Sequence, residues 1–552
     1  MAARSPSAGS RKKKKTRKAK ATASNLTKKS KKRSDEIDAD GGNNAAADDG
    51  SNEVDTSRST DDTTDTTAIE SVVSNDSVSR RTFLDFFWTL ASTDQSDRVG
   101  AANGIVSFLV AEQAKPKTED DVPASAVEED NVPASAVAFG SCHESLRYAL
   151  KRLVKGLQSS RAGARQGFSL ALVGILQHPA FSELVSIGEV LSFGDTVLDY
   201  AVMKKRHEAR ECMFGKVFLY MAVHRSKRLT NPEDVMRVTE NLVVLAHKKP
   251  FLREICLETV GEIATAASVT LCRDTILPIV VRDVAGFRNL GKDVDPADDV
   301  DPLSPEELAL AFALRSRFGA LKQHKDSPSY AVLQTLFRLT DNNSIDSWLE
   351  PLKASSGVFP RVHTVWTHML KTEKKTKKSK KSPAKSAHNT PLERCLSVWH
   401  TVVEPHFFRG TSHERKYLGF QLMHRFLESL QQQQHHGQCA QLLTPNLLSC
   451  VYNNVMDDSA LLHDAAVKAV RALLTQPPLV RVTAAVSLMA CARRSRIKAN
   501  SDDGKDLIQQ LLSYTKEVYD THHHSHNIYV CIGDHHRHTI YVQRPGRPSL
   551  FH

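Results

Sequence analysis

One short stretch places residues with catalytic potential side by side: SHERKYLGFQLM, from Ser412 to Met423. A His-Glu pair on a helix is half of the H-E-x-x-H motif, in which a second histidine one turn later completes a zinc site and the glutamate acts as general base. Here the fourth residue after His413 is Tyr417, and the next histidine, His424, lies three helical turns away. This spacing excludes a shared metal ion.

The same stretch matches the start of a helix. Thr411 is placed to be the N-cap, and Glu414 is placed to reach back to the cap amide, as in a capping box. Apolar residues follow from Tyr417 onward. We therefore predict that Glu414 caps a helix, and that His413 and Arg415 face outward or lie across a junction between repeats.

Other common catalytic patterns do not occur in the sequence. It has no G-x4-G-K-S/T phosphate loop, no G-x-G-x-x-G after a strand and no G-x-S-x-G nucleophile elbow. Carboxylates for a two-metal nucleotidyl transfer site must project from a rigid element, whereas Asp and Glu cluster in residues 35–70 and 293–302. Histidine clusters at 522–526 and 535–538 are compatible with metal chelation or with adventitious affinity only. We expect no enzymatic activity, no cofactor, no resident metal and no catalytic residue.

The cysteines and the apolar runs indicate the compartment. Nine cysteines, an odd number, are scattered without any C-x-x-C pair, so we expect reduced, buried thiols in an intracellular protein. No stretch approaches the 18 apolar residues of a membrane span, and the N-terminus lacks the apolar run of a signal peptide. We expect a soluble protein that is not secreted and does not contact a membrane.

Helical periodicity dominates the sequence from residue 144 onward. Leu146, Ala149, Leu150, Leu153 and Leu157 follow the i, i+3, i+4, i+7 rule, and a second such pattern follows the turn SSRAGA. We predict an all-α HEAT- or armadillo-like α-solenoid built from hairpins of about 35–45 residues; several separate helical bundles are the alternative. Further helix pairs are predicted at 196–224, 232–267, 271–287, 305–339, 344–370, 391–430, 442–474 and 477–519.

Composition shifts divide the chain into segments. The last segment contains two β-like runs, 528–532 and 539–542, and it is either a genuine appendage or the frameshifted end of a truncated chain. The predicted segments are a disordered basic then acidic tail at 1–80, the solenoid at 81–370 with a linker at 113–142 and an acidic loop at 291–305, a basic disordered insertion at 371–390, continuing repeats at 391–520, and a His-rich tail at 521–552.

The formal charge of +11 is concentrated outside the predicted folded body. Residues 1–33 hold 14 Lys and Arg and no acid, residues 371–385 carry +7, and residues 35–70 carry −11. The remaining residues are therefore nearly neutral as a group. Charge of this density in short runs favours either nuclear localisation or sequence-tolerant, salt-sensitive binding of DNA or RNA, with a solubilising tail as the alternative.

The residues that we predict to act in localisation or nucleic-acid contact lie in three runs. They are Arg11, Lys12, Lys13, Lys14, Lys15, Arg17, Lys18, Lys20, Lys28, Lys29, Lys31, Lys32, Arg33, Lys374, Lys375, Lys377, Lys378, Lys380 and Lys381. A second, structured basic face is predicted on the first hairpin, either as a solvated helix face or as a phosphate contact. It comprises Arg147, Lys151, Arg152, Lys155, Arg161 and Arg165.

Several stretches together resemble one family. In order, they are FLDFFWTLAS, YALKRLVKGLQSSRAGARQGFSLAL, HKKPFLREICLETV, VHTVWTHML, SHERKYLGFQL and NNVMDDSALLHDAAVKAV. Over residues 81–475 the chain is similar to the N-terminal half of the family of Myb-binding protein 1A and yeast DNA polymerase phi. The resemblance implies a nucleolar, chromatin-associated protein with an armadillo-like fold, linked to ribosomal RNA gene transcription, ribosome biogenesis and transcriptional co-regulation. It supplies no catalytic residues, and the members are longer than this chain.

The sequence therefore predicts a non-enzymatic scaffold of the nucleus and nucleolus. Its basic runs are expected to bind nucleic acid, DNA or ribosomal RNA, with low sequence specificity. Its helical surface is expected to bind transcription or ribosome-assembly proteins. The alternatives are a karyopherin-like transport solenoid and a template-directed DNA polymerase that uses Asp298 and Asp299.

Overall fold

A computed structural model of the chain describes residues 74–114, 138–140, 142–288, 303–319, 321–341, 345–355, 361–371, 391–432, 435–495, 500–522, 528–531 and 539–542. Most of the predicted basic and acidic tail, most of the predicted linker and acidic loop, almost all of the basic insertion and the histidine clusters therefore lie outside the described residues.

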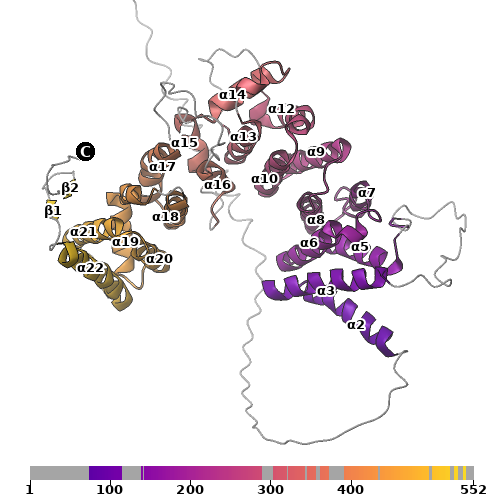
Figure 1. The fold of residues 1–552 in the computed structure, drawn as a ribbon, viewed down its shortest axis with the longest axis horizontal. Coiled ribbons are helices and arrows are strands. Elements are labelled where there is room, and N and C mark those ends of the chain that lie inside the picture. Colours follow the sequence, from indigo (N-terminus) through magenta and orange to yellow (C-terminus); the bar gives the residue numbers. More distant parts are fainter. Residues whose placement is uncertain are drawn as a thin grey trace, which may run out of the picture. The chain divides into compact units, whose positions relative to one another are not determined.

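The described residues are almost entirely helical, which confirms the predicted all-α class (Figure 1). Pro or a capping side chain begins many of these helices, as helix N-termini require. In the first part of the chain the helices are α2 (Ser74–Thr89), α3 (Gln95–Gln113), α5 (Glu144–Gly156), α6 (Ala162–Gln177), α7 (Ile187–Val197), α8 (Arg206–Arg225), α9 (Pro232–Lys248), α10 (Pro250–Ala266), α11 (Val269–Leu271) and α12 (Leu277–Asp283).

The second part of the chain continues the same pattern. Its helices are α13 (Pro305–Phe318), α14 (Tyr330–Leu339), α15 (Ile345–Ala354), α16 (Thr364–Leu370), α17 (Pro391–Val398), α18 (His413–Gln432), α19 (Pro445–Val455), α20 (His463–Leu474), α21 (Pro478–Arg494) and α22 (Asp502–His522). Short 3₁₀ or π segments lie between them at Pro179–Phe181, Cys272–Ile276, Ala285–Phe287, Leu321–His324, Trp399–Phe408 and His436–Leu442.

The two β-like runs near the C-terminal end form strands. β1 (Ile528–Cys531) and β2 (Thr539–Val542) pair antiparallel, with Ile528 opposite Val542. These bounds coincide with the predicted run at 539–542 and with residues 528–531 of the predicted run at 528–532.

One set of helices forms a continuous series of contacts, which we call the stacked row: α3, α6, α8, α10, α13 and α16. α2, α5, α7 and α9 each pack against the stacked-row helix that follows them, so each pair is a helical hairpin. Later in the chain, α19 pairs with α20 and α21 with α22, while α18, α20 and α22 contact one another in turn. Hairpins that contact their neighbours in chain order are consistent with the predicted helical-repeat array.

Two clusters of buried apolar residues form the core of this array. The first runs from Phe83 to Leu336 and the second from Leu308 to Leu511. α13 contributes to both, because Leu310 and Leu314 belong to the first cluster whereas Leu308, Ala309 and Phe312 belong to the second. A helix that is apolar on all sides is expected where both flanks are covered.

The structure corrects two predicted boundaries and confirms the prediction for the thiols. α2 begins at Ser74, inside the segment predicted as a disordered tail. Phe139, inside the predicted linker, is fully buried at a φ of 65°, and its N–H donates to Glu189 Oε1 at 2.5 Å. The Pro- and Ala-rich composition upstream gives no sign that Phe139 is buried, because its partners lie on α7.

The eight cysteines whose burial is described are free and buried, as predicted.

A polar joint connects α7, α8 and α9. The Asp195 carboxylate accepts hydrogen bonds from Tyr220 Oη at 3.1 Å and from Arg237 Nη2 at 2.6 Å, and Lys216 Nζ lies 3.0 Å from it. Burial alone would raise the pKa of Asp195, but Lys216 and Arg237 outweigh burial and lower it. The charged carboxylate therefore holds three helices together.

We expect Gly167→Ala to destabilise the protein by about 1–3 kcal/mol, because a Cβ at Gly167 would lie 2.0 Å from the Leu90 carbonyl oxygen at the end of α2. Urea unfolding measures the effect. Gly100→Ala on α3 is the matched control, since a Cβ there meets nothing within 4 Å and should stabilise the helix by about 0.5–1 kcal/mol. Equal behaviour of the two variants would contradict this packing.

We expect Asp195→Asn to destabilise the protein by about 1–3 kcal/mol near neutral pH. Because the folded-state pKa of Asp195 is lowered, its contribution is present above the ordinary aspartate range and is lost as pH falls through the folded-state value. The difference in unfolding free energy between wild type and variant should therefore shrink below about pH 4. A difference that stays constant from pH 7 to pH 3 would exclude the charged joint.

Candidate functional site

The basic runs that the sequence singles out lie outside the described residues, both at 11–33 and at 374–381. The structure therefore places only the predicted basic face on the first hairpin, which comprises α5 and α6.

Three residues of that face form a row along α5. Arg147, Lys151 and Lys155 are spaced by one helical turn, and Lys155 is exposed. The pKa of Lys151 is lowered, first by partial burial and then by repulsion from Arg147 and Lys155. The row is therefore a locally positive surface that an anion would stabilise.

Two residues predicted to belong to the same face contact neighbouring helices instead. The Arg152 guanidinium lies over the Phe87 ring at 4.6 Å and donates to Tyr148 Oη, so it holds α5 to α2. Arg165 is buried, lies 2.8 Å from Glu211 and stacks over Phe214 at 4.9 Å. The assignment of Arg165 to an exposed face is wrong, because its partners come from α8 and sequence spacing on α6 cannot show them.

The sixth predicted residue belongs to a recurring feature. Arg161 is the exposed N-cap of α6, and the N-cap residues of α8 and α10 are Lys205 and Lys249. Positions 161, 205 and 249 follow one another at intervals of 44 residues, and none of the three side chains makes a capping hydrogen bond. The basic residues are visible in the stretches SSRAGAR, KKRHEAR and HKKPFLR. That they lie on neighbouring helices of the stacked row can be seen only in the structure.

Two of the family-like stretches meet at a buried polar joint between α10 and α16. The Glu254 carboxylate accepts from the Thr364 backbone N–H at 3.0 Å and pairs with Arg361. His363 lies between two carboxylates, with Nδ1 3.9 Å from Glu254 and Nε2 3.8 Å from Glu306 on α13. The stretches HKKPFLREICLETV and VHTVWTHML therefore fix helices from different hairpins.

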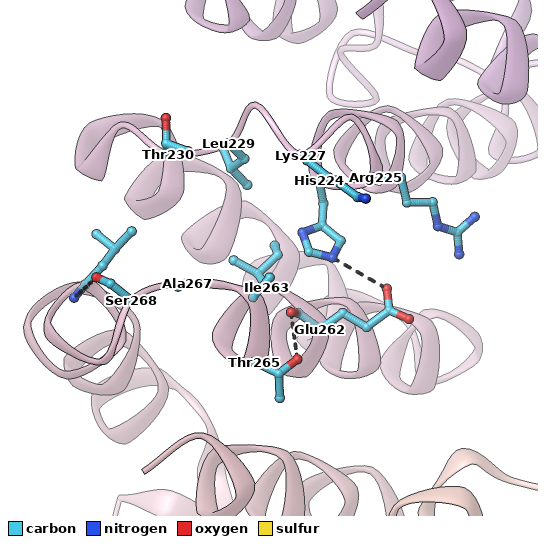
Figure 2. Close-up of a pocket in the computed structure, with 12 residues that line it drawn as sticks. His224, Arg225, Lys227, Leu229, Thr230, Glu262, Ile263, Thr265, Ala267 and Ser268 are labelled. Atoms are coloured by element: carbon cyan, nitrogen blue, oxygen red, sulfur yellow. Dashed lines mark hydrogen bonds and ion pairs between the residues drawn. The ribbon is translucent and has the colours of Figure 1, made fainter. Parts of the chain in front are cut away.

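Figure 2 shows a pocket of about 820 Å³ at the C-terminal ends of α8 and α10. His224 Nε2 lies 4.0 Å from Glu262 Oε2 across it, and Arg225 and Lys227 line the same side. Burial lowers the pKa of His224, and Arg225 adds to this whereas Glu262 opposes it. His224 is therefore largely neutral at physiological pH, and the charged residues that line the pocket are Arg225, Lys227 and Glu262.

The stretch SHERKYLGFQLM begins a helix, as predicted, with a different cap. Ser412 Oγ accepts from the Arg415 N–H at 3.4 Å, whereas the Thr411 hydroxyl donates back to the Phe407 carbonyl at 2.9 Å. The N-cap is therefore Ser412, not Thr411, because the π-helical segment before it captures the Thr411 hydroxyl. His413 and Arg415 are exposed, and Glu414 takes part in the cap through Ser412, which lowers the pKa of its carboxyl.

Within the described ranges, the structure brings no three His, Cys, Asp or Glu side chains together in a way that would hold a metal ion. None of the described helices is long and apolar enough to cross a membrane.

The described part of the chain defines an all-α protein of stacked helical hairpins whose candidate site is a surface. Residues 148–489, more than half of the chain, match the family described as DNA polymerase phi. The chain belongs to this family, as the resemblance predicted.

Curated relatives carry the names of regulators and binding proteins. The rDNA transcriptional regulator pol5 of Schizosaccharomyces pombe is 26% identical over 59% of this chain and 32% of its own length. The rDNA transcriptional regulator POL5 of Saccharomyces cerevisiae is 26% identical over 61% of this chain and 34% of its own. Human Myb-binding protein 1A is 29% identical over 32% of this chain and 11% of its own. The chain spans about a third or less of the length of these relatives.

We expect Glu254→Ala to destabilise the protein by about 2–4 kcal/mol, because it leaves the Thr364 N–H and the Arg361 guanidinium without their buried acceptor. Glu240→Ala is the matched control: it also removes a carboxylate from an arginine, Arg282, but at an exposed pair and should cost less than about 1 kcal/mol. Urea unfolding of both variants measures the difference. Equal losses would show that Glu254 does not join the two helices.

Proposed function

We propose that this chain is a non-enzymatic scaffold of the nucleolus and of chromatin that binds DNA or ribosomal RNA together with protein partners. In this role it acts in the regulation of ribosomal RNA gene transcription and in ribosome biogenesis, as a transcriptional co-regulator. The observation that carries the proposal is membership of a family whose curated relatives are named as rDNA transcriptional regulators and Myb-binding proteins.

The distribution of charge supports the nucleic-acid part of the proposal. Two segments, 1–33 and 371–385, concentrate the positive charge of the chain. Lysine and arginine in such runs neutralise phosphates and release counterions without reading base sequence. Such segments deliver a protein to nucleic acid and leave the choice of protein partners to the folded part.

The helical surface supports the partner-binding part. Large apolar side chains remain exposed at separate places on the described helices, among them Trp88 at 71% on α2 and Val244 at 52% on α9. Helical-repeat proteins use extended surfaces of stacked helices to bind other chains. We therefore assign partner recognition to the helices.

We expect deletion of residues 1–33 together with 371–385 to abolish nucleolar enrichment of a fluorescently tagged protein, because both removed segments carry dense positive charge. In vitro, the slope of log K against log salt for duplex DNA should become shallower.

Deletion of residues 35–70, a segment of similar length that carries −11, serves as the control and should leave the localisation unchanged. A strongly nucleolar distribution after removal of both basic segments would remove them from the proposal.

A further inference from the structure

A cluster of cations and aromatic rings lies where α8 and α10 begin, next to the start of α6. We call Arg161, Lys205, Arg206, Arg210, Lys249 and Phe251 the basic edge. α6 and α8 run in the same direction, since they are joined near their N-terminal ends at Arg165 and Glu211 and near their C-terminal ends at Gln177 and Arg225. α10 follows the same direction, since Phe251 at its start contacts Phe214 in the first half of α8, and Glu262 near its end lies 4.0 Å from His224 near the end of α8. Their first turns therefore lie along one side of the stacked row.

Arg210 occupies the centre of the basic edge. Its guanidinium lies 5.7 Å from the centre of the Phe214 ring on α8 and 5.3 Å from that of Phe251 on α10, and the two rings are 5.4 Å apart. No carboxylate pairs with Arg210 in the part of the chain that the structure describes. Stacking on rings orients the guanidinium and leaves its N–H donors available to an incoming anion.

The outer part of this cluster is accessible. Phe251 is 47% exposed, and Arg206 and Arg210, one turn apart on α8, are both exposed. An exposed phenylalanine beside exposed arginines offers a ring face for a base and charges for the phosphates on either side of it. A purely acidic partner would use the charges and gain little from the ring.

Basic residues here weaken the helices that carry them. The N-terminal end of a helix carries partial positive charge, so lysine or arginine there is unfavourable. α3, α7, α9 and α13 instead begin at Asp94, Ser186, Asn231 and Ser304, each of which caps its helix with a hydrogen bond. Lys205 is compensated by an ion pair with Glu208 at 3.0 Å. Arg161, Arg206 and Lys249 lie at helix starts without a carboxylate partner among the described residues, and a bound polyanion would remove this cost.

We propose that the basic edge binds single-stranded nucleic acid, with Phe251 stacking on a base and Arg206, Arg210 and Lys249 contacting neighbouring phosphates. The inference rests on the proposed nucleic-acid role and adds to it a site in the folded body, separate from the basic runs. Single strands fit because their bases are free to stack, whereas those of a duplex are paired and stacked on one another.

The test uses the full-length chain with the Lys and Arg residues of 1–33 and 371–385 changed to Gln, so that binding by those segments is removed. Fluorescence anisotropy with labelled oligouridine is measured over a range of salt concentrations. We expect the slope of log K against log salt to become less negative by about 2 in the triple variant Arg206→Gln/Arg210→Gln/Lys249→Gln. This change corresponds to the loss of three phosphate contacts to a single strand. Lys322→Gln/Lys325→Gln/Lys468→Gln removes the same charge from exposed positions elsewhere and should leave the slope close to that of the parent.

A second variant separates stacking from charge. Phe251→Leu keeps an apolar contact for Phe214 but removes the ring, so it should weaken oligouridine binding about tenfold without changing the salt slope. Thermal unfolding followed by circular dichroism checks that each variant is folded.

The outcomes distinguish this inference from the proposed function. If the chain with neutral segments does not bind oligouridine, or if the two triple variants behave alike, the basic edge is not a nucleic-acid site. Binding of polyglutamate that is insensitive to Phe251→Leu, without binding of oligouridine, would assign the edge to an acidic protein instead. Failure of the unmodified chain to bind either duplex DNA or oligouridine would overturn the proposed function itself.

Discussion

The parallel packing of α6, α8 and α10 within the stacked row is the constraint on which the other features of this chain depend. Each hairpin has an apolar face that it cannot bury alone, so it must pack on the next hairpin. Close approach makes this possible: at Gly167 on α6, the Leu90 carbonyl oxygen lies where a side chain would begin. Because α6 and α8 are aligned along their length, residues that begin one helix lie beside residues that begin the next.

This alignment produces two kinds of polar feature: buried joints that stabilise the fold, and exposed cations that contribute little to its stability. At the joints, carboxylates receive hydrogen bonds from neighbouring helices, as Asp195 does from Arg237 and Glu254 from Thr364. These contacts offset the cost of burying charge. Along the basic edge, Lys205 pairs with Glu208, whereas Arg161 and Lys249 lie at the starts of α6 and α10 without a carboxylate partner in the described part of the chain. The first kind of feature holds the fold together, and the second makes one side of it receptive to anions.

The elements could be predicted from the sequence where local rules decide them. The apolar spacing of residues 146–157 predicted α5, and Pro305 after Ser304 marks the start of α13 through a complete capping box. Prediction failed where a distant residue decides the outcome. Thr411 is as good a cap as Ser412 by composition, but its hydroxyl bonds to Phe407, and Arg165 resembles a surface residue until Glu211 and Phe214 are placed beside it. The basic edge has a sequence signal at 44-residue intervals, but only the packing of α6, α8 and α10 shows that the three positions share one side.

α13 has a further consequence for the way the chain loses structure. Repeat arrays unfold as coupled neighbours, and the weakest junction sets how far unfolding spreads. α13 supplies residues to both apolar clusters, so opening either cluster exposes one flank of the same helix. Loss of structure in either cluster therefore removes part of the packing of α13, and this helix couples the stability of the two clusters.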